Sequence, residues 1–83
     1  MKIKIYSTPV CSYCHLLKDH LKKHNVEFED VDVSKDQAAG QEMVNKSGQM
    51  GVPVSIITTD DGKEEIITGF DKAKIDELLN IKE

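Results

Sequence analysis

The order of strands and helices in the first third of the chain restricts the fold more than any other feature. Residues 2–6 alternate apolar and polar side chains, which predicts a short strand. Residues 12–24 carry leucines at helical spacing and predict a helix that ends at Asn25. Residues 26–33 alternate again and predict a second strand. Joins this short indicate a βαβ unit with parallel strands and a right-handed crossover. The predicted apolar stripe of the helix consists of Leu16, Leu17 and Leu21.

A second helix is predicted after the second strand. Ser34 and Gln37 form a capping-box pattern, so this helix is expected to begin at Ser34. It runs to about Lys46 and ends near Gly48, because glycine commonly terminates helices. Few of its side chains are apolar, so its pattern is the weakest in the chain.

The last third of the chain predicts a hairpin and a final helix. Strands at 51–59 and 64–68 are separated by a segment containing Asp61-Gly62, a typical two-residue hairpin turn, and are therefore antiparallel. A helix over 72–81 follows, with Asp71 as its N-cap. The order β-α-β-α-β-β-α predicts one α/β domain over residues 1–83, with a four-stranded mixed sheet and three helices.

Charge and composition exclude several classes of function. The chain has 83 residues, a formal net charge of −4 and no arginine, whereas nucleic-acid binders usually carry a basic surface. Lys4 interrupts the apolar N-terminal residues, which argues against a signal peptide. No apolar run approaches the roughly 20 residues of a membrane span. We therefore expect a cytoplasmic protein that binds neither nucleic acid nor membrane.

The motif C-S-Y-C-H at residues 11–15 carries the chemistry of the chain, and three kinds of site use such a string. C-x-x-C-H attaches c-type haem, C-x-x-C supplies half of many zinc sites, and C-x-x-C is also the dithiol of redox enzymes. Cysteines in a reducing compartment are more often catalytic or metal-binding than structural. The rest of the chain has to distinguish these alternatives.

The predicted helix favours the dithiol. Cys11 stands at its N-terminal edge, where unpaired backbone N–H groups and the helix dipole stabilise a thiolate. Cys14 lies about one turn further, on the same face, within reach of a mixed disulfide formed by Cys11. We therefore predict that Cys11 is the nucleophile and Cys14 the resolving thiol. A buried structural pair of cysteines is the alternative.

The histidines do not complete a metal or haem site in this pattern. His15, His20 and His24 all lie on the same predicted helix, so a Cys₂His₂ zinc site would need awkward geometry. Haem attachment would need export and room for a large cofactor. His15 either tunes the thiolate or faces solvent without a role, and His20 with His24 is interpreted as a solvated face. No metal site is predicted.

Val52-Pro53 is the second informative feature, since proline at the start of a strand removes a ladder donor. A cis peptide bond beside an exposed backbone that receives a partner would explain it. A trans proline in an ordinary turn explains the residues equally well.

Taken together, these segments resemble the glutaredoxin family. The matching blocks are I-Y-S-T-P-V-C-S-Y-C-H at 5–15, S-G-Q-M-G-V-P-V at 47–54 and T-G-F-D at 68–71. The resemblance covers nearly the whole chain and implies a thioredoxin fold. It also implies a cis Pro53 and reduction of protein disulfides and glutathione mixed disulfides.

The resemblance further implies a groove for glutathione across the dithiol. The backbone of Val52 would pair with the cysteinyl part of the tripeptide, Tyr13 would flank the sulfur, and Gln49 would contact the glycine carboxylate. The γ-glutamyl end would lie against residues 69–71. For Gln49 and Asp71 the alternatives are a surface residue and a plain helix N-cap. The implied glutathione-binding residues are Tyr13, Gln49, Val52, Pro53, Gly69, Phe70 and Asp71.

Three residues depart from the family pattern. Ser12 replaces the proline of the common C-P-Y-C motif and should alter the redox potential. Thr8 stands where many members have lysine, so one positive charge is missing beside the thiolate and the glutathione carboxylate. Phe70 follows Gly69 where a glycine pair is common. In this bulky residue the chain resembles glutaredoxin-like redoxins that serve ribonucleotide reductase and draw electrons from thioredoxin reductase.

The leading hypothesis is therefore a monomeric, glutathione-dependent thiol–disulfide oxidoreductase. Glutathione is its co-substrate, glutathionylated or disulfide-containing proteins are its partners, and it needs no bound cofactor. The alternative is a redoxin reduced by a flavoprotein, thioredoxin reductase. A third hypothesis is an iron–sulfur carrier with Cys11 and glutathione as cluster ligands, against which Cys14 counts.

Overall fold

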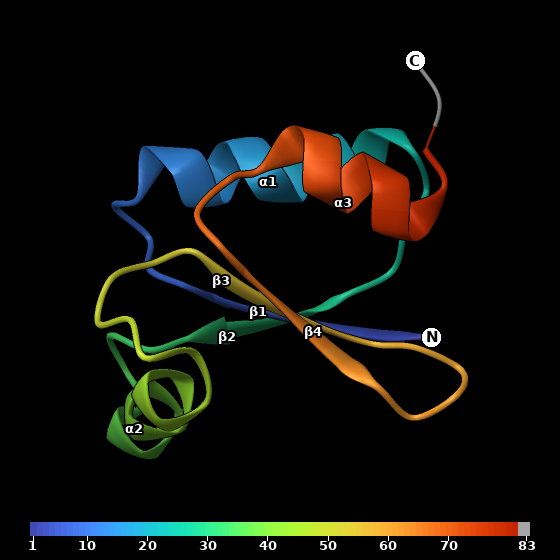
Figure 1. Ribbon diagram of the computed structural model, residues 1–83. Coiled ribbons are helices and arrows are strands. Elements are labelled where there is room, and N and C mark those ends of the chain that lie inside the picture. The colour runs from blue at the N-terminus through green and yellow to red at the C-terminus, as the bar shows by residue number, and fades with distance from the viewer. Residues whose placement is uncertain (82–83) are drawn as a thin grey trace.

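The computed structural model describes residues 1–81 as a four-stranded sheet with helices on both faces (Figure 1). The predicted element order and α/β class are confirmed. None of the helices within the described residues is long and apolar enough to cross a membrane. The elements are β1 (Lys2–Ser7), α1 (Ser12–Lys23), β2 (Glu29–Asp32), α2 (Gln37–Ser47), β3 (Val54–Thr58), β4 (Glu64–Thr68) and α3 (Lys72–Leu79).

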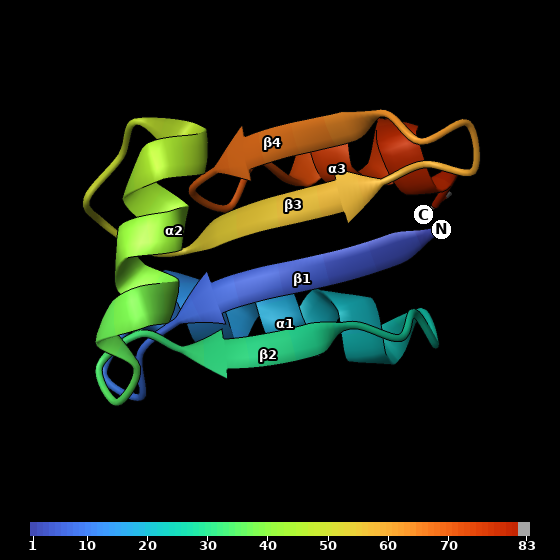
Figure 2. The same cartoon turned by 90° about the horizontal axis from the view of Figure 1, so that it is seen from below.

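The sheet has the strand order β2-β1-β3-β4 (Figure 2). As predicted, β1 and β2 are parallel and are joined through α1. β3 pairs antiparallel with both β1 and β4, which closes the predicted hairpin. The two central strands, β1 and β3, are therefore hydrogen-bonded on both sides.

Alternate side chains of the central strands enter two separate cores. α1 and α3 cover one face of the sheet and α2 covers part of the other (Figure 1). Ile5 belongs to the cluster under α1 and α3, together with Leu17 of α1. Its neighbour Tyr6 belongs to the second cluster, together with Met43 of α2. This is the period of two that the alternation in the sequence predicts.

The predicted apolar stripe of α1 is partly wrong. Leu17 and Leu21 are buried, but Leu16 is 51% exposed. His20 is buried instead, and its Nε2 lies 2.6 Å from Asp76 Oδ1 on α3. The sequence interpretation placed His20 on a solvated face because its pair with His24 had no third metal ligand. A carboxylate partner from a distant helix allows the ring to be buried without an unsatisfied nitrogen.

The second strand is shorter than predicted because the end of α1 uses part of that segment. Asn25 has a positive φ of 58° and stops the helix, as predicted. The Val26 amide then donates back to Leu21 O at 2.9 Å, so it is not available to a sheet neighbour. Val26 and Phe28 pack against the core from the connection, and the ladder begins at Glu29.

The predicted N-cap of α2 is wrong by two residues. The Ser34 hydroxyl and amide both donate to the Asp32 carboxylate, so this serine closes a turn after β2. Asp36 is the N-cap, and its side chain accepts the Ala39 N–H at 3.0 Å. Gly48 ends the helix in the left-handed conformation, as predicted.

The strand predicted at 64–68 is observed as β4, but β3, the hairpin loop and α3 differ from the prediction at their ends. β3 begins at Val54 rather than at residue 51, since the preceding residues form the proline loop. The Thr59 amide donates to Lys63 O at 2.8 Å, so the hairpin loop is longer than the predicted two residues. Asp71 caps α3, as predicted, but Asn80 is left-handed and ends this helix after Leu79.

Neighbouring leucines test which face of α1 is structural. Leu17→Ala should lower the free energy of unfolding by about 2–5 kcal/mol, because the side chain is completely buried and its removal leaves a cavity. Leu16→Ala should change it by about 0.5 kcal/mol, as is usual for exposed positions. Urea denaturation measures both values, and equal losses would contradict this assignment of faces.

The stability contributed by the contact between α1 and α3 should depend on pH. Hydrogen bonds from Lys72 and His20 hold the pKa of Asp76 below its usual value. A depressed pKa stabilises the fold above about pH 4, and this contribution disappears as the pH falls through the folded-state value. Asp76→Asn should therefore destabilise the protein at neutral pH and converge with the parent in acid.

Urea midpoints for parent and variant at about pH 7 and about pH 3 check this. Asp19→Asn, on the exposed side of α1, controls for loss of a carboxylate. A gap between parent and Asp76→Asn that is equally wide at both pH values would contradict the linkage.

Candidate active site

Cys11 is the N-cap of α1. Its backbone is extended, with φ −87° and ψ 111°, and its Sγ accepts the Cys14 N–H at 3.1 Å. The sulfur thus occupies the position in which serine or aspartate oxygens usually satisfy the free amides of a first helical turn. The predicted placement of Cys11 at the helix edge and Cys14 one turn in is confirmed.

The two cysteines have different environments although three positions separate them. Both are free thiols; Cys11 is partly exposed, whereas Cys14 is 0% exposed. Burial and the nearby Cys11 sulfur raise the pKa of Cys14 to about 12, against smaller opposing effects of the Thr8 backbone and Lys18. Cys14 is therefore a protonated thiol at neutral pH. This asymmetry is what the predicted roles of nucleophile and resolving thiol require.

The loop before β3 lies against the dithiol. The Val52-Pro53 peptide bond is cis, as the family resemblance implied. The Cys11 thiol points toward the Val52 carbonyl, with 3.8 Å between sulfur and oxygen. Pro53 is buried, and its own carbonyl accepts the Gly69 N–H at 2.8 Å. The blocks at residues 5–15 and 68–71 therefore both contact the proline loop of the block at 47–54.

Residues 69–71 connect this loop to α3. Gly69 has a φ of +74°, which is costly for any residue with a Cβ. The Asp71 carboxylate accepts the Lys74 N–H at 3.2 Å, as a helix N-cap does. Phe70 packs against the core, with its ring 5.9 Å from that of His20. Of these three residues, Phe70 is the one whose side chain packs against the core.

Gln49 and Tyr13 complete the residues implied for a glutathione groove. The Gln49 side-chain amide donates to Gly51 O at 3.3 Å. Tyr13 lies between the cysteines and is exposed. Gln49 and Asp71 each have a hydrogen-bond partner within the chain. The geometry therefore also fits a surface residue at Gln49 and a plain helix N-cap at Asp71. Their role toward a ligand stays a prediction.

His15 is held by the loop before Cys11. Its Nε2 donates to Pro9 O at 2.8 Å, so the ring is turned toward this loop on an exposed part of α1. Within residues 1–81, no three histidine, cysteine or acidic side chains are grouped in a way that would hold a metal ion.

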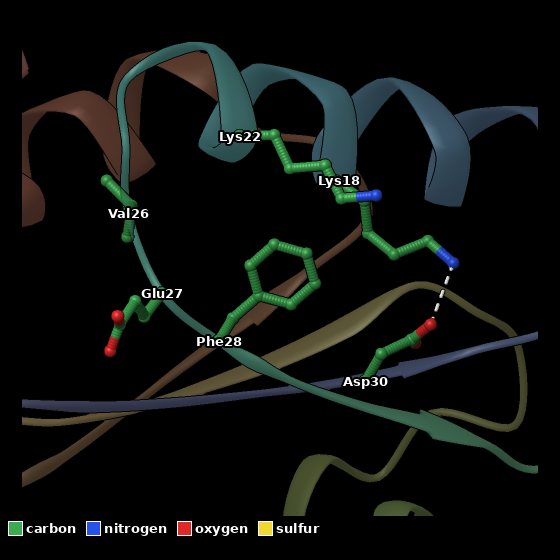
Figure 3. A pocket seen from close by; sticks show the side chains of 6 residues that line it. All are labelled: Lys18, Lys22, Val26, Glu27, Phe28 and Asp30. Atoms are coloured by element: carbon green, nitrogen blue, oxygen red, sulfur yellow. Dashed lines mark hydrogen bonds and ion pairs between the residues drawn. The ribbon is translucent and has the colours of Figure 1, made fainter.

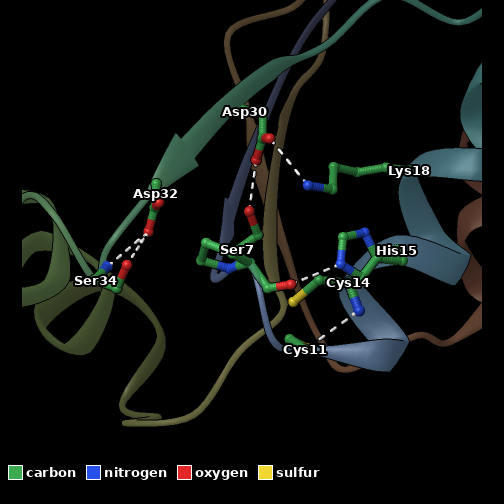
Figure 4. A network of polar contacts seen from close by, with 9 residues as sticks. Ser7, Cys11, Cys14, His15, Lys18, Asp30, Asp32 and Ser34 are labelled. Carbon is green, nitrogen blue, oxygen red and sulfur yellow. Dashed lines mark hydrogen bonds and ion pairs between the residues drawn. The ribbon is translucent and has the colours of Figure 1, made fainter.

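Two features of the site escaped the sequence analysis. The first is a set of exposed apolar side chains that flank the motif or the proline loop: Val10, Tyr13, Leu16 and Met50. Val10 and Met50 are 91% and 86% exposed, and their places beside Cys11 and two residues before Val52 were readable signals. The second is a polar network of Ser7, Lys18 and Asp30 behind Cys14 (Figure 4).

An open hollow of about 530 Å³ lies between α1 and the segment leading into β2 (Figure 3). Its lining shares Lys18 and Asp30 with the polar network but includes neither cysteine. The side chains that line it are Lys18, Lys22, Val26, Glu27, Phe28 and Asp30.

This fold and this dithiol define a class: redox proteins with a thioredoxin fold and a C-x-x-C motif at the start of the first helix. The chain belongs to the glutaredoxin family, whose family model matches residues 3–60. The glutaredoxin resemblance in the sequence is thereby confirmed.

Individual relatives carry both glutaredoxin-like and thioredoxin-like names. A glutaredoxin-like 8.6 kDa protein in the rubredoxin operon of Clostridium pasteurianum is 49% identical over 77 residues, covering 93% of this chain and 96% of the relative. The crystal structure of a mutant of the thioredoxin-like protein BC3987 is 37% identical, with a TM-score of 0.85 and coverage of 98% and 97%. The glutaredoxin-like NrdH-redoxin from Escherichia coli is 28% identical, with a TM-score of 0.76 and coverage of 94% and 95%.

Alkylation should distinguish the two thiols. Iodoacetamide at neutral pH should modify Cys11 and leave Cys14 unmodified, because Cys14 is buried and protonated. Peptide mass mapping after a limited reaction measures this, and urea-unfolded protein, in which both should react, is the control. Equal labelling of both cysteines in the folded protein would contradict the asymmetry.

Proposed function

We propose that this chain is a dithiol oxidoreductase that reduces disulfides of partner proteins. The observation that carries this proposal is the buried Cys14, in contact with a partly exposed Cys11 that exposed apolar side chains flank. A surface of this kind suits a protein partner better than it suits a small, charged tripeptide, since apolar contacts dominate the centre of protein interfaces.

The reaction consists of two thiol–disulfide exchanges. The Cys11 thiolate attacks one sulfur of the partner disulfide, and the partner's other sulfur leaves as a thiolate. Cys14 then attacks Cys11, which releases the partner's second sulfur and leaves a Cys11–Cys14 disulfide. Two electrons pass to the partner, whose two thiolates take up protons as the chain's thiols lose theirs.

We propose a second dithiol protein, such as a flavoprotein reductase, as the donor that reduces the chain again. Glutathione carries two carboxylates, and the cations that would bind them are few here. Thr8 stands in place of a lysine, and Gln49 and Asp71 have partners within the chain. The thioredoxin-like name of BC3987 and the thioredoxin-like activity profile of NrdH-redoxin support the same choice. We expect the reaction to take place in a reducing cytoplasm.

Glutathione as direct reductant is the second candidate. The Val52 carbonyl faces Cys11, and α3 begins at Lys72, shortly after Gly69, whose amide donates to the Pro53 carbonyl. These groups could pair with the backbone and the α-carboxylate of a γ-glutamyl peptide. Membership of the glutaredoxin family also supports this candidate.

Parallel turnover assays separate the two donors. Reduction of a protein disulfide should proceed with NADPH and a thioredoxin reductase. It should be at least about tenfold slower with glutathione, glutathione reductase and NADPH, because Thr8 stands where a lysine would attract a glutathione carboxylate. Faster turnover with glutathione would replace the proposed donor by the second candidate.

Serine variants control for the chemistry in these assays. Cys11→Ser should abolish turnover with either donor, since no nucleophile remains. Cys14→Ser should abolish reduction of protein disulfides and form a stable mixed disulfide. Retained protein-disulfide turnover in Cys14→Ser would overturn the two-cysteine mechanism.

A further inference from the structure

We propose that Lys18 is a positioning residue for the second exchange: its ammonium group, fixed by Asp30 and Ser7, stabilises the Cys14 thiolate when that thiolate attacks Cys11. This inference rests on the proposed function, because it concerns the step in which Cys14 releases a partner.

The polar network holds Lys18 in one place. Lys18 follows Cys14 by four positions on α1, the spacing that brings side chains to the same helix face. Its Nζ lies 3.0 Å from Asp30 Oδ2 on β2, and only 14% of its side chain is exposed. Asp30 Oδ1 in turn accepts the hydroxyl of buried Ser7 at 2.6 Å. Figure 4 shows Lys18 extending from α1 toward this carboxylate.

Burial and several neighbouring groups act on the pKa of Cys14. Burial is the largest influence and raises the pKa of Cys14, and the Cys11 sulfur raises it further. The Thr8 backbone and the Lys18 charge act in the opposite direction. Asp30 faces Lys18 from β2, and the Asp32 carboxylate on the same strand also interacts with the Lys18 charge. His15, which follows Cys14 on α1, is turned to Pro9.

Formation of the mixed disulfide changes this balance. Cys11 then carries no negative charge and accepts less strongly, so both of its effects on the Cys14 pKa are lost. Burial still opposes the thiolate, and the two favourable influences that remain are a backbone amide and Lys18. The cation is therefore one of two favourable influences in the step in which Cys14 must ionise.

The step is balanced without any further reagent. Cys14 gives its proton to water, and its sulfur forms a bond with Cys11. The bond between Cys11 and the partner's sulfur breaks, and its electron pair leaves with the partner's thiolate, which takes a proton from water.

Ellman's reagent isolates this step. One equivalent reacts with Cys11 and releases one thionitrobenzoate; attack by Cys14 on the resulting mixed disulfide releases the second. Stopped-flow absorbance follows both phases across a range of pH in the parent, Lys18→Gln, Lys18→Arg and Lys22→Gln. Lys22 is the matched control, because it lies one turn further along α1 in the lining of the same hollow (Figure 3).

In Lys18→Gln the second phase should slow by about threefold near neutral pH, and its pH profile should move to higher pH. One pKa unit changes the thiolate fraction tenfold, and the greater nucleophilicity of a more basic thiolate offsets about half of that on a logarithmic scale. Lys18→Arg should keep the parent profile, and Lys22→Gln should match the parent.

Equal slowing in Lys18→Gln and Lys22→Gln, or no change in either, would overturn the role of Lys18. A lower rate without a displaced pH profile would also overturn it, since that result indicates a purely structural loss. Absence of a second phase in the parent would instead overturn the proposed function itself. Thermal unfolding of each variant confirms that the compared proteins are folded.

Discussion

The burial of β1 at the centre of the sheet fixes where the dithiol lies. Ile5 and Tyr6 are completely buried on opposite faces, so a slip of one residue would exchange two cores of different composition. Pairing with β2 and β3 on both sides holds this register. The strand ends at Ser7, and the Cys11 amide then donates to Thr8 O at 3.3 Å. The position of the nucleophile is therefore set by the strand that precedes it.

The sequence predicted the elements better than their ends, and the reason differs from case to case. Strand periodicity and the Asp71 cap are local properties, so the chain order and the last helix start could be read directly. Ser34 and Asp36 are both suitable N-cap residues. Asp36 caps α2 because the Ser34 hydroxyl donates to Asp32 instead. His20 is buried because of Asp76, 56 positions later, and no local pattern contains that information.

In the active site, too, local features could be predicted from the sequence and contacts between distant segments could not. The helix start gave the positions of Cys11 and Cys14, because the C-x-x-C spacing and the N-terminal end of a helix are both local. The cis Pro53 followed from the family resemblance and not from the residues alone. Contacts across elements could not be predicted, as the Ser7–Asp30–Lys18 network shows: it joins a strand end, an edge strand and a helix. Its members are ordinary polar residues until the sheet brings them together.

The difference between the two sulfurs is a consequence of geometry at a helix start. A side chain that caps the first turn must lie outside the helix, next to unpaired amides and near solvent. A side chain one turn further, on the face that meets the sheet, must be buried. A C-x-x-C motif in this position therefore cannot give two equivalent thiols. Cys11 gains a donor from Cys14's own backbone, while Cys14 loses water and must obtain its stabilisation from fixed groups of the protein. The two-step chemistry of the dithiol thus follows from where α1 begins.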